Sequence, residues 1–270
     1  HTSFKCDWSS DVCSSDLHLQ PLAALEDNCI WLLRDDDGRA LIVDPGDAAP
    51  VLAALDTTPA PHAILLTHHH GDHIGGVAPL LQRWPDLPVI APHDARIALA
   101  TRRVGDGDMV EAGAWRFQVI EIPGHTRSHI AFFGDGLLFC GDTLFSLGCG
   151  RLFEGTPAQM LTSLHTLASL PGDTLVCCGH EYTLANAAFA LNVDPGNAAL
   201  RDRATQARAL REAGRPTLPA TLVSERACNP FLRSNEPAIR TALAAHLGRM
   251  PADAVDAFAE LRHWKDGFRA

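Results

Sequence analysis

Thr67-His68-His69-His70-Gly71-Asp72-His73 is the stretch that decides the fold of this 270-residue chain. An apolar run of strand length, Ala63–Leu66, leads into it, and a helix-like segment that ends near Trp84 follows it. The His and Asp side chains are therefore expected on a loop between a buried strand and a helix. A histidine-rich surface loop or a tag remnant is the alternative. A tag, however, stands at a chain end without an apolar strand before it.

The spacing of four side chains in this loop suits two metal ions. Alternate residues of an extended segment share one face, so His68 and His70 can bind one ion together. Asp72 and His73 follow the bend at Gly71 and can turn toward a second ion. Neutral imidazole and carboxylate are ligands that Zn²⁺ and Fe²⁺ accept.

Three further ligand candidates, His125, Asp142 and His180, each follow a predicted strand and a glycine. Glycine lets the backbone turn sharply and approach its neighbours closely at such points. Ligands gathered beyond the strand ends are where open sheets place active sites. One such residue alone is more often an ordinary surface or core residue. Three repeats of the pattern, together with the histidine-rich loop, predict a metal site.

Composition excludes several classes of protein. The formal net charge of −10 argues against a nucleic-acid-binding surface, which needs a basic stripe. No apolar run reaches the roughly 20 residues of a transmembrane helix, and no signal peptide is recognised. The eight cysteines lack the Cys-x-x-Cys spacing of zinc knuckles and redox motifs. We therefore expect reduced, mostly buried cysteines in a cytoplasmic protein.

The chain is expected to have three parts. Residues 1–17 lack hydrophobic periodicity and are interpreted as a non-native or disordered leader, because Cys13–Leu17 resembles the translation of a common sequencing adapter. Residues 18–179 mix predicted strands and helices, as an α/β (α+β) domain does. In residues 180–270, Ala-rich helical patterns replace the strands, which predicts a smaller all-helical C-terminal domain.

These motifs resemble those of the metallo-β-lactamase superfamily. Within it, the likeness is to the glyoxalase II (hydroxyacylglutathione hydrolase) family, and it runs from about Leu17 to the chain end. The stretches that carry it are Thr67–Gly76, Asp27-Asn28, Gly124–Thr126, Gly141–Phe145, Gly148–Thr156, Cys178–Thr183, Asn229–Arg233 and Lys265–Phe268. The resemblance implies an αββα sandwich followed by a helical substrate-binding domain.

The resemblance also implies a ligand set for two divalent ions. It assigns His68, His70 and His125 to the first ion, Asp72, His73 and His180 to the second, and Asp142 to a bridge between them. Asp72 and Asp142 are the residues given a catalytic role. Zn²⁺ is the expected metal, and Fe or Mn would suit the same ligands. Two dications lower the pKa of a bridging water, so that a hydroxide nucleophile exists near pH 7.

The implied reaction is hydrolysis of S-(2-hydroxyacyl)glutathione thioesters, such as S-D-lactoylglutathione to D-lactate and glutathione, in methylglyoxal detoxification. A thiolate leaves with little acid assistance, because the pKa of a free thiol is about 8.5. The alternative is another enzyme of the superfamily: a β-lactamase, a lactonase, another thioesterase or a sulfur dioxygenase. A flavodiiron-like electron-transfer protein would need a flavin domain, for which the chain is too short. We expect a monomer whose partner is the small thioester, with no nucleic acid and no membrane.

Five residues are implied to contact glutathione: Arg151, Phe153, Tyr182, Arg262 and Lys265. Arginine and lysine suit the carboxylates of this ligand. A solvated helix end is the alternative for Arg262 and Lys265, because basic residues favour the last turn of a helix. Phe153 stands where some family members have Tyr, which removes one hydroxyl contact.

Overall fold

The computed structural model describes residues 18–269, so the leader expected at residues 1–17 lies outside the described residues. The first half of the strand-rich region contains β1 (His18–Ala24), β2 (Asn28–Arg34), β3 (Ala40–Val43), α1 (Ala48–Ala54), β4 (Ala63–Leu65), α2 (Gly71–Ile74), α3 (Val77–Arg83), β5 (Val89–Pro92) and β6 (Arg102–Val104). The second half contains β7 (Met109–Ala112), β8 (Trp115–Glu121), β9 (Ile130–Gly134), β10 (Leu137–Gly141), β11 (Leu144–Phe145), β12 (Gly148–Cys149), α4 (Pro157–Ala168) and β13 (Leu175–Cys178).

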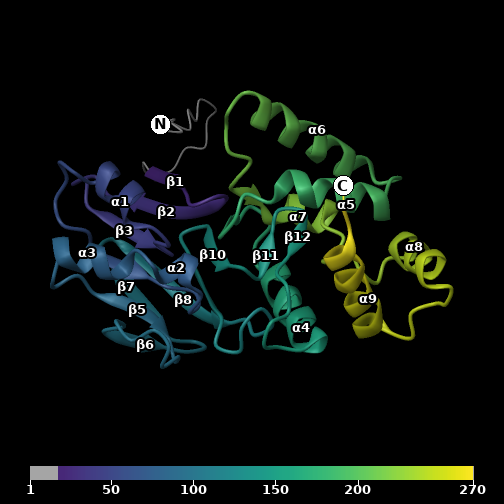
Figure 1. The fold of residues 1–270 in the computed structure, drawn as a ribbon, viewed down its shortest axis with the longest axis horizontal. Coiled ribbons are helices and arrows are strands. Elements are labelled where there is room, and N and C mark those ends of the chain that lie inside the picture. The colour runs from purple at the N-terminus through teal and green to yellow at the C-terminus, as the bar shows by residue number, and fades with distance from the viewer. Residues whose placement is uncertain (1–17, 270) are drawn as a thin grey trace.

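The strands form two six-stranded sheets, with helices α1 and α3 beside the first (Figure 1). The strand order is β1-β2-β3-β4-β5-β6 in the first sheet. In the second it is β14-β13-β10-β9-β8-β7, where β14 (Ala220–Thr221) comes from the C-terminal part of the chain. The predicted αββα sandwich of the α/β class is confirmed.

The side chains of β2 point alternately into two different cores, which explains why the sheets pack in layers. Trp31 and Leu33 belong to the core between the two sheets, whereas Ile30 and Leu32 belong to the core under α1 and α3. Successive side chains of a strand point to opposite faces, so a strand covered on both faces is apolar at every position. All four of these side chains are buried.

Three of the four loops that carry the ligand candidates leave strands that have a parallel neighbour, whereas the His125 loop leaves β8, which pairs antiparallel on both sides. β3, β4 and β5 run parallel in the first sheet, and β10 and β13 run parallel in the second. The carboxyl ends of parallel neighbours lie at one edge of a sheet. The loops after β4, β10 and β13 therefore open toward the same region of the sandwich.

The C-terminal region is mostly helical, as expected, and contains α5 (Thr183–Val193), α6 (Ala198–Glu212), α7 (Leu222–Cys228), α8 (Pro237–Leu247) and α9 (Ala254–Gly267). Its strand β14 pairs with β13 through only two residue pairs. A strand this short carries no hydrophobic period, which is why the sequence did not indicate it. Helices α8 and α9 lie on the far side of the molecule from α1 and α3 (Figure 1). Among the described residues, no helix has the length and apolar character needed to cross a membrane.

Candidate functional site

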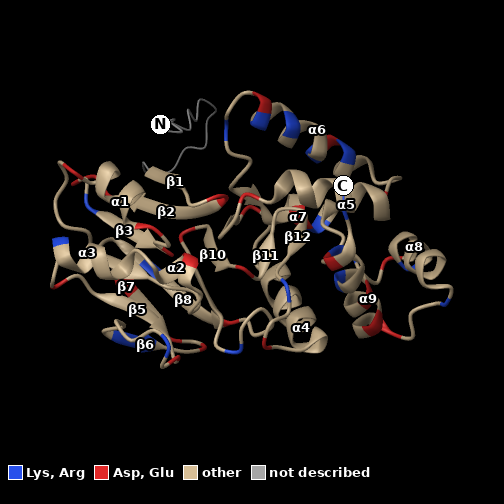
Figure 2. Cartoon of the chain, viewed as in Figure 1, with Lys and Arg blue, Asp and Glu red and all other residues tan. Residues whose placement is uncertain are grey.

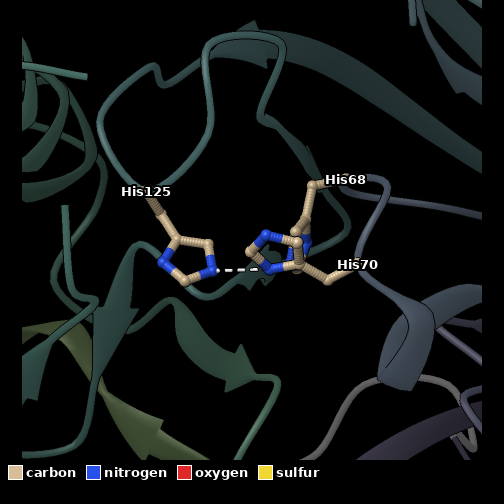
Figure 3. A group of neighbouring side chains, drawn as sticks. All are labelled: His68, His70 and His125. Carbon is tan, nitrogen blue, oxygen red and sulfur yellow. Dashed lines mark hydrogen bonds between the residues drawn. The ribbon is translucent and has the colours of Figure 1, made fainter. Parts of the chain in front are cut away.

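The first predicted ligand group comes together at the end of β4. One ring nitrogen from each of His68, His70 and His125 lies within 4.8 Å of the other two. His70 Nδ1 is 3.1 Å from His68 Nε2 and 3.0 Å from His125 Nε2 (Figure 3). His125 arrives from the β8–β9 loop, 55 residues along the chain from His70. Three imidazoles that converge on one point match the donor set of a transition metal.

The second predicted group forms beside the first. Asp72, His73 and His180 each offer one ligand atom within the same 4.8 Å limit. Asp72 Oδ2 lies 3.3 Å from His180 Nε2 and 3.6 Å from His73 Nε2. Asp72 and His73 are placed by the short helix α2, whereas His180 directly follows β13 and Gly179.

Asp142 connects the two groups. Its Oδ2 lies 3.4 Å from His125 Nε2 in the first group and 3.3 Å from His180 Nε2 in the second. Its Oδ1 lies 3.3 Å from His73 Nε2. A single buried carboxylate that faces imidazoles of both groups has the position that a bridging ligand needs.

In four of the five ligand imidazoles, Nδ1 points away from the centre of the site and contacts an oxygen atom. This contact turns Nε2 toward the centre. The outer contacts are His68 Nδ1 to Thr67 Oγ1 at 3.0 Å, His73 Nδ1 to Asp44 Oδ2 at 3.0 Å, His125 Nδ1 to Arg151 O at 2.9 Å, and His180 Nδ1 to Asp27 Oδ1 at 2.8 Å. Metal-ligating histidines are oriented by contacts of this kind.

Two buried atoms at the centre support a cation site. Within residues 18–269, His73 Nε2 and Asp142 Oδ1 form no hydrogen bond with each other, although they are 3.3 Å apart, or with any other group. Buried polar atoms without a partner are rare in folded proteins, and a bound ion can satisfy such atoms. The inward-facing nitrogens and the carboxylate between them therefore fit two divalent metal ions.

The protonation states of the histidines also suit metal binding. Burial lowers the pKa of His68 well below its ordinary value, and burial lowers the pKa of His70 to about 4. Both rings are thus neutral near pH 7, which is the form that binds a metal. Burial also lowers the pKa of His73, but the carboxylates of Asp142 and Asp44 outweigh it and raise that pKa well above its ordinary value. A cation at the centre would displace this proton, so metal binding is coupled to proton release.

The glycine before His180 is required by the close packing of the site. A Cβ atom on Gly179 would lie 2.5 Å from Asp142 Oδ1 and 2.7 Å from His73 Cε1. Any larger residue would push apart the carboxyl and imidazole groups that meet there. The glycine–ligand pattern found in the sequence is thus a packing requirement at this position.

Three residues around the centre were not predicted as site residues. Asp44 accepts hydrogen bonds from Thr67 N and Thr67 Oγ1, at 2.8 and 2.7 Å, and faces His73. Asp27 faces His180. His129 stacks on His68 with ring centroids 4.5 Å apart, and its Nε2 accepts a hydrogen bond from Asp142 N at 3.2 Å. Asp44 follows β3 directly, so the strand-end pattern could have found it; His129, inside a loop, gave no such signal.

Two predicted substrate residues lie against the ligand groups. The Phe153 ring is 63% exposed and stands edge-on to His70 and His125, with centroids 5.6 and 5.2 Å away. Tyr182 stacks on His180, with centroids 4.7 Å apart and planes at 5°. The two aromatic rings thus flank opposite ligand groups.

The predicted cationic residues gather near α9, a helix on which Figure 2 colours both basic and acidic positions. Arg262 is only 6% exposed, and it donates from Nη1 to Cys149 O at 2.7 Å and from Nη2 to Asp266 Oδ1 at 2.9 Å. Arg151 Nε lies 3.5 Å from the same Asp266 oxygen. Lys265 Nζ donates to Ala185 O at 3.1 Å. A solvated helix end therefore does not describe Arg262; a substrate contact by this residue stays a prediction.

Comparison with known proteins gives the family of the chain. Residues 28–180 match the family model of the metallo-β-lactamase superfamily, and residues 181–268 match that of the hydroxyacylglutathione hydrolase C-terminus. A "Hydroxyacylglutathione hydrolase" of Xylella fastidiosa (strain M23) is 62% identical over 252 residues, covering 93% of this chain and 98% of the relative. A second relative with this name, from Xanthomonas axonopodis pv. citri (strain 306), is 62% identical over 255 residues, covering 94% of this chain and all of the relative.

A solved structure has a similar fold. The crystal structure of TTHA1623 in a di-iron-bound form is 34% identical, with a TM-score of 0.51, over 59% of this chain and 90% of that one. That protein holds two irons, and the present chain has His/Asp groups suited to a dinuclear site on the same fold. The two family models, the 62% identity over nearly the whole length and the paired ligand groups agree: the chain belongs to the hydroxyacylglutathione hydrolase family of the metallo-β-lactamase superfamily.

Proposed function

We propose that this protein hydrolyses S-(2-hydroxyacyl)glutathione thioesters, converting S-D-lactoylglutathione to D-lactate and glutathione in methylglyoxal detoxification. The relatives at 62% identity carry the name of this activity. The observation that carries the proposal is the position of Asp142, whose carboxylate faces imidazoles of two separate ligand groups. A centre for two ions is suited to the hydrolysis of an activated carbonyl.

The proposed ligands are the seven residues of the two groups and their connecting carboxylate: His68, His70, His125, Asp72, His73, His180 and Asp142. Zn²⁺ is the proposed metal, with Fe or Mn as alternatives that accept the same donors. When bound, the ions supply Lewis acidity, which polarises the thioester carbonyl and activates water. Asp72 and Asp142 are the proposed catalytic carboxylates of the centre.

The residues of the chain orient the reacting groups. The carboxylates of Asp44 and Asp27 keep His73 and His180 turned inward, so the centre does not have to reorganise when substrate arrives. Phe153 and Tyr182 offer aromatic rings beside the two ligand groups, against which the thioester can pack.

The glutathione part of the substrate is proposed to bind toward α9. Arg151, Arg262 and Lys265 are the proposed partners of its carboxylates. Arg262 also holds the backbone of the β12 turn from which Arg151 extends. We propose that residues 18–179 form the catalytic domain and residues 180–270 the substrate-binding domain of a monomeric, cytoplasmic enzyme. Free, buried cysteines at all six cysteine positions of residues 18–269 support a reducing compartment.

A comparison of three substrates tests the proposal. The purified, metal-loaded protein is assayed with S-D-lactoylglutathione, with nitrocefin and with an acyl homoserine lactone. We expect kcat/KM for the glutathione thioester to exceed the other two by orders of magnitude. Faster hydrolysis of the lactone or of nitrocefin would instead support the alternative of another superfamily enzyme.

A further inference from the structure

A network of charged side chains lies next to the first ligand group and contains none of the proposed metal ligands. Arg96 is its centre, in the loop after β5. Its Nε and Nη2 donate to Asp94 at 2.9 and 2.7 Å, and its Nη1 and Nη2 donate to Glu154 at 2.5 and 3.3 Å. The guanidinium group therefore holds two carboxylates that come from loops 60 residues apart.

Each carboxylate is tied in turn to the loop that carries His125. Asp94 Oδ2 accepts a hydrogen bond from Ser128 Oγ at 2.5 Å. Glu154 Oε2 accepts one from Arg127 N at 2.8 Å. Asp94 is itself buried, with its side chain 5% exposed, so a lost partner there would be costly.

The histidine-rich loop reaches the same network through His69. This residue stands between two proposed ligands, and its ring lies 3.5 Å from Asp94 Oδ2 and 3.8 Å from Glu154 Oε1. Its Nδ1 is buried and has no hydrogen-bond partner among the described residues. The network thus touches the loop of His70, the loop of His125 and the loop of Phe153.

The second ligand group is held by other partners. Asp27 faces His180, Asp44 faces His73, and Asn28 Nδ2 donates to Asp72 Oδ2 at 3.2 Å. In the described structure, none of these three residues makes a hydrogen bond or an ion pair with Arg96, Asp94 or Glu154. The two groups therefore have separate outer supports.

We propose that Arg96, acting through Asp94 and Glu154, is a positioning residue that sets the spacing between His70 and His125 and thereby the affinity for the first metal ion. The proposal rests on the two-ion centre proposed above. Outer partners of metal ligands typically change metal affinity by about 10- to 100-fold. Loss of Arg96 leaves the two carboxylates to repel each other and frees the three loops to separate.

A chelator challenge of the full-length, zinc-loaded protein tests this role. The variant Arg96→Met is equilibrated with increasing dipicolinate, and bound zinc per protein is measured by mass spectrometry. We expect one ion to leave at about 10- to 100-fold lower chelator concentration than in the parent, while the other is retained. An anomalous-scattering map of the half-depleted variant should show the remaining peak beside His73 and His180.

The chain offers a matched control. Arg249 is 49% exposed like Arg96, and it also joins two carboxylates, Asp256 at 2.6 Å and Glu260 at 2.8 Å, but on α9. Arg249→Met should keep the parental chelator profile. Glu154→Gln preserves the side-chain shape and serves as a second variant if Arg96→Met folds poorly; it should show the same selective loss.

The outcomes separate this proposal from the proposed function. Parental zinc retention in both variants, or equal weakening of both ions, overturns the positioning role. A parent protein that holds one ion, or that does not hydrolyse the thioester, overturns the two-ion function itself. A selective loss that Arg249→Met reproduces would also overturn the role, because charge removal alone would then be sufficient.

Discussion

The metal-ligand edge of the sandwich and the cationic group near α9 differ in how their side chains are held. At the edge, four of the five ligand imidazoles have an oxygen partner that turns them inward, as Asp27 does for His180. Near α9, the cations already donate to partners within the protein: Arg262 to Cys149 O and Lys265 to Ala185 O. The edge is organised for ions before they bind, whereas the cationic group must share its donors with substrate. Changes at the edge should therefore act on metal content and kcat, and changes near α9 on KM.

The largest expected effect is at the centre of the edge. Asp142→Ala removes the carboxylate shared by both ligand groups, so we expect kcat to fall by more than about 100-fold, the upper range for outer partners alone. Cys178→Ala, a buried β13 residue outside the ligand set, should keep near-parental activity. The measurement is steady-state hydrolysis with zinc content determined in parallel. Full activity of Asp142→Ala with zinc restored would contradict the bridging role.

The second effect should appear in KM. Arg262→Ala with Lys265→Ala removes two cations proposed to bind glutathione carboxylates away from the reacting carbonyl. One charge-assisted hydrogen bond is worth roughly 1.5–3 kcal/mol, so KM should rise about 10- to 100-fold with a much smaller change in kcat. Arg262 is buried, so a lower melting temperature should accompany this change.

Two controls separate binding from damage to the fold. Arg201→Ala with Arg208→Ala removes the same charge from the exposed side of α6 and should leave KM unchanged. A thioester without glutathione carboxylates should be hydrolysed equally by parent and double variant. If KM for the glutathione thioester stays parental while kcat collapses, α9 has a structural role in place of a binding role.

A pH dependence should follow from Lys265 alone. Burial, together with the nearby charges of Arg262 and Arg151, lowers the pKa of Lys265 to about 8. The side chain therefore loses its charge as pH rises through that value, and KM should increase between about pH 7 and 9. The measurement is KM across this range, compared with Lys265→Met, whose profile should lack this increase. Identical profiles in parent and variant would remove Lys265 from the substrate site.

The smallest effect is expected at Phe153. Phe153→Tyr adds a hydroxyl to a ring that lies against His70 and His125 but is largely exposed. A net hydrogen bond contributes about 0.5–1.5 kcal/mol, and exposure favours the lower end, so KM should fall about 2- to 3-fold. The measurement is KM at fixed zinc content. An increase in KM would mean that the apolar face, and not a missing hydroxyl, is what the substrate needs.

The metal-ligand edge of the sandwich could be predicted from the sequence because each ligand lies close in the sequence to the strand that positions it. Each ligand lies one to eight residues after a strand, and the strand direction fixes where its side chain can reach. The same local pattern was present at Asp44, directly after β3, although it was not recognised there. The strand β14, with only two residues, carries too few positions to show a period.

The region near α9 and the Arg96 network depend on packing between distant segments. Arg262 meets Cys149 across 113 residues, and Arg96 meets Glu154 across 58. No spacing in the sequence indicates such pairs, since they result from how a helix or a loop docks. The buried state of Arg262 was for this reason not expected from its position in a helix end.

The two-ion centre is tested by an anomalous-scattering map of the natively purified protein, collected at the X-ray absorption edge of the bound metal. We expect two peaks about 3.5 Å apart, as in other two-metal hydrolytic sites. One peak should lie among His68, His70 and His125, the other among Asp72, His73 and His180, with Asp142 between them. A single peak, with His180 turned away from it, would mean that the centre holds one ion and that Asp142 is not a bridge.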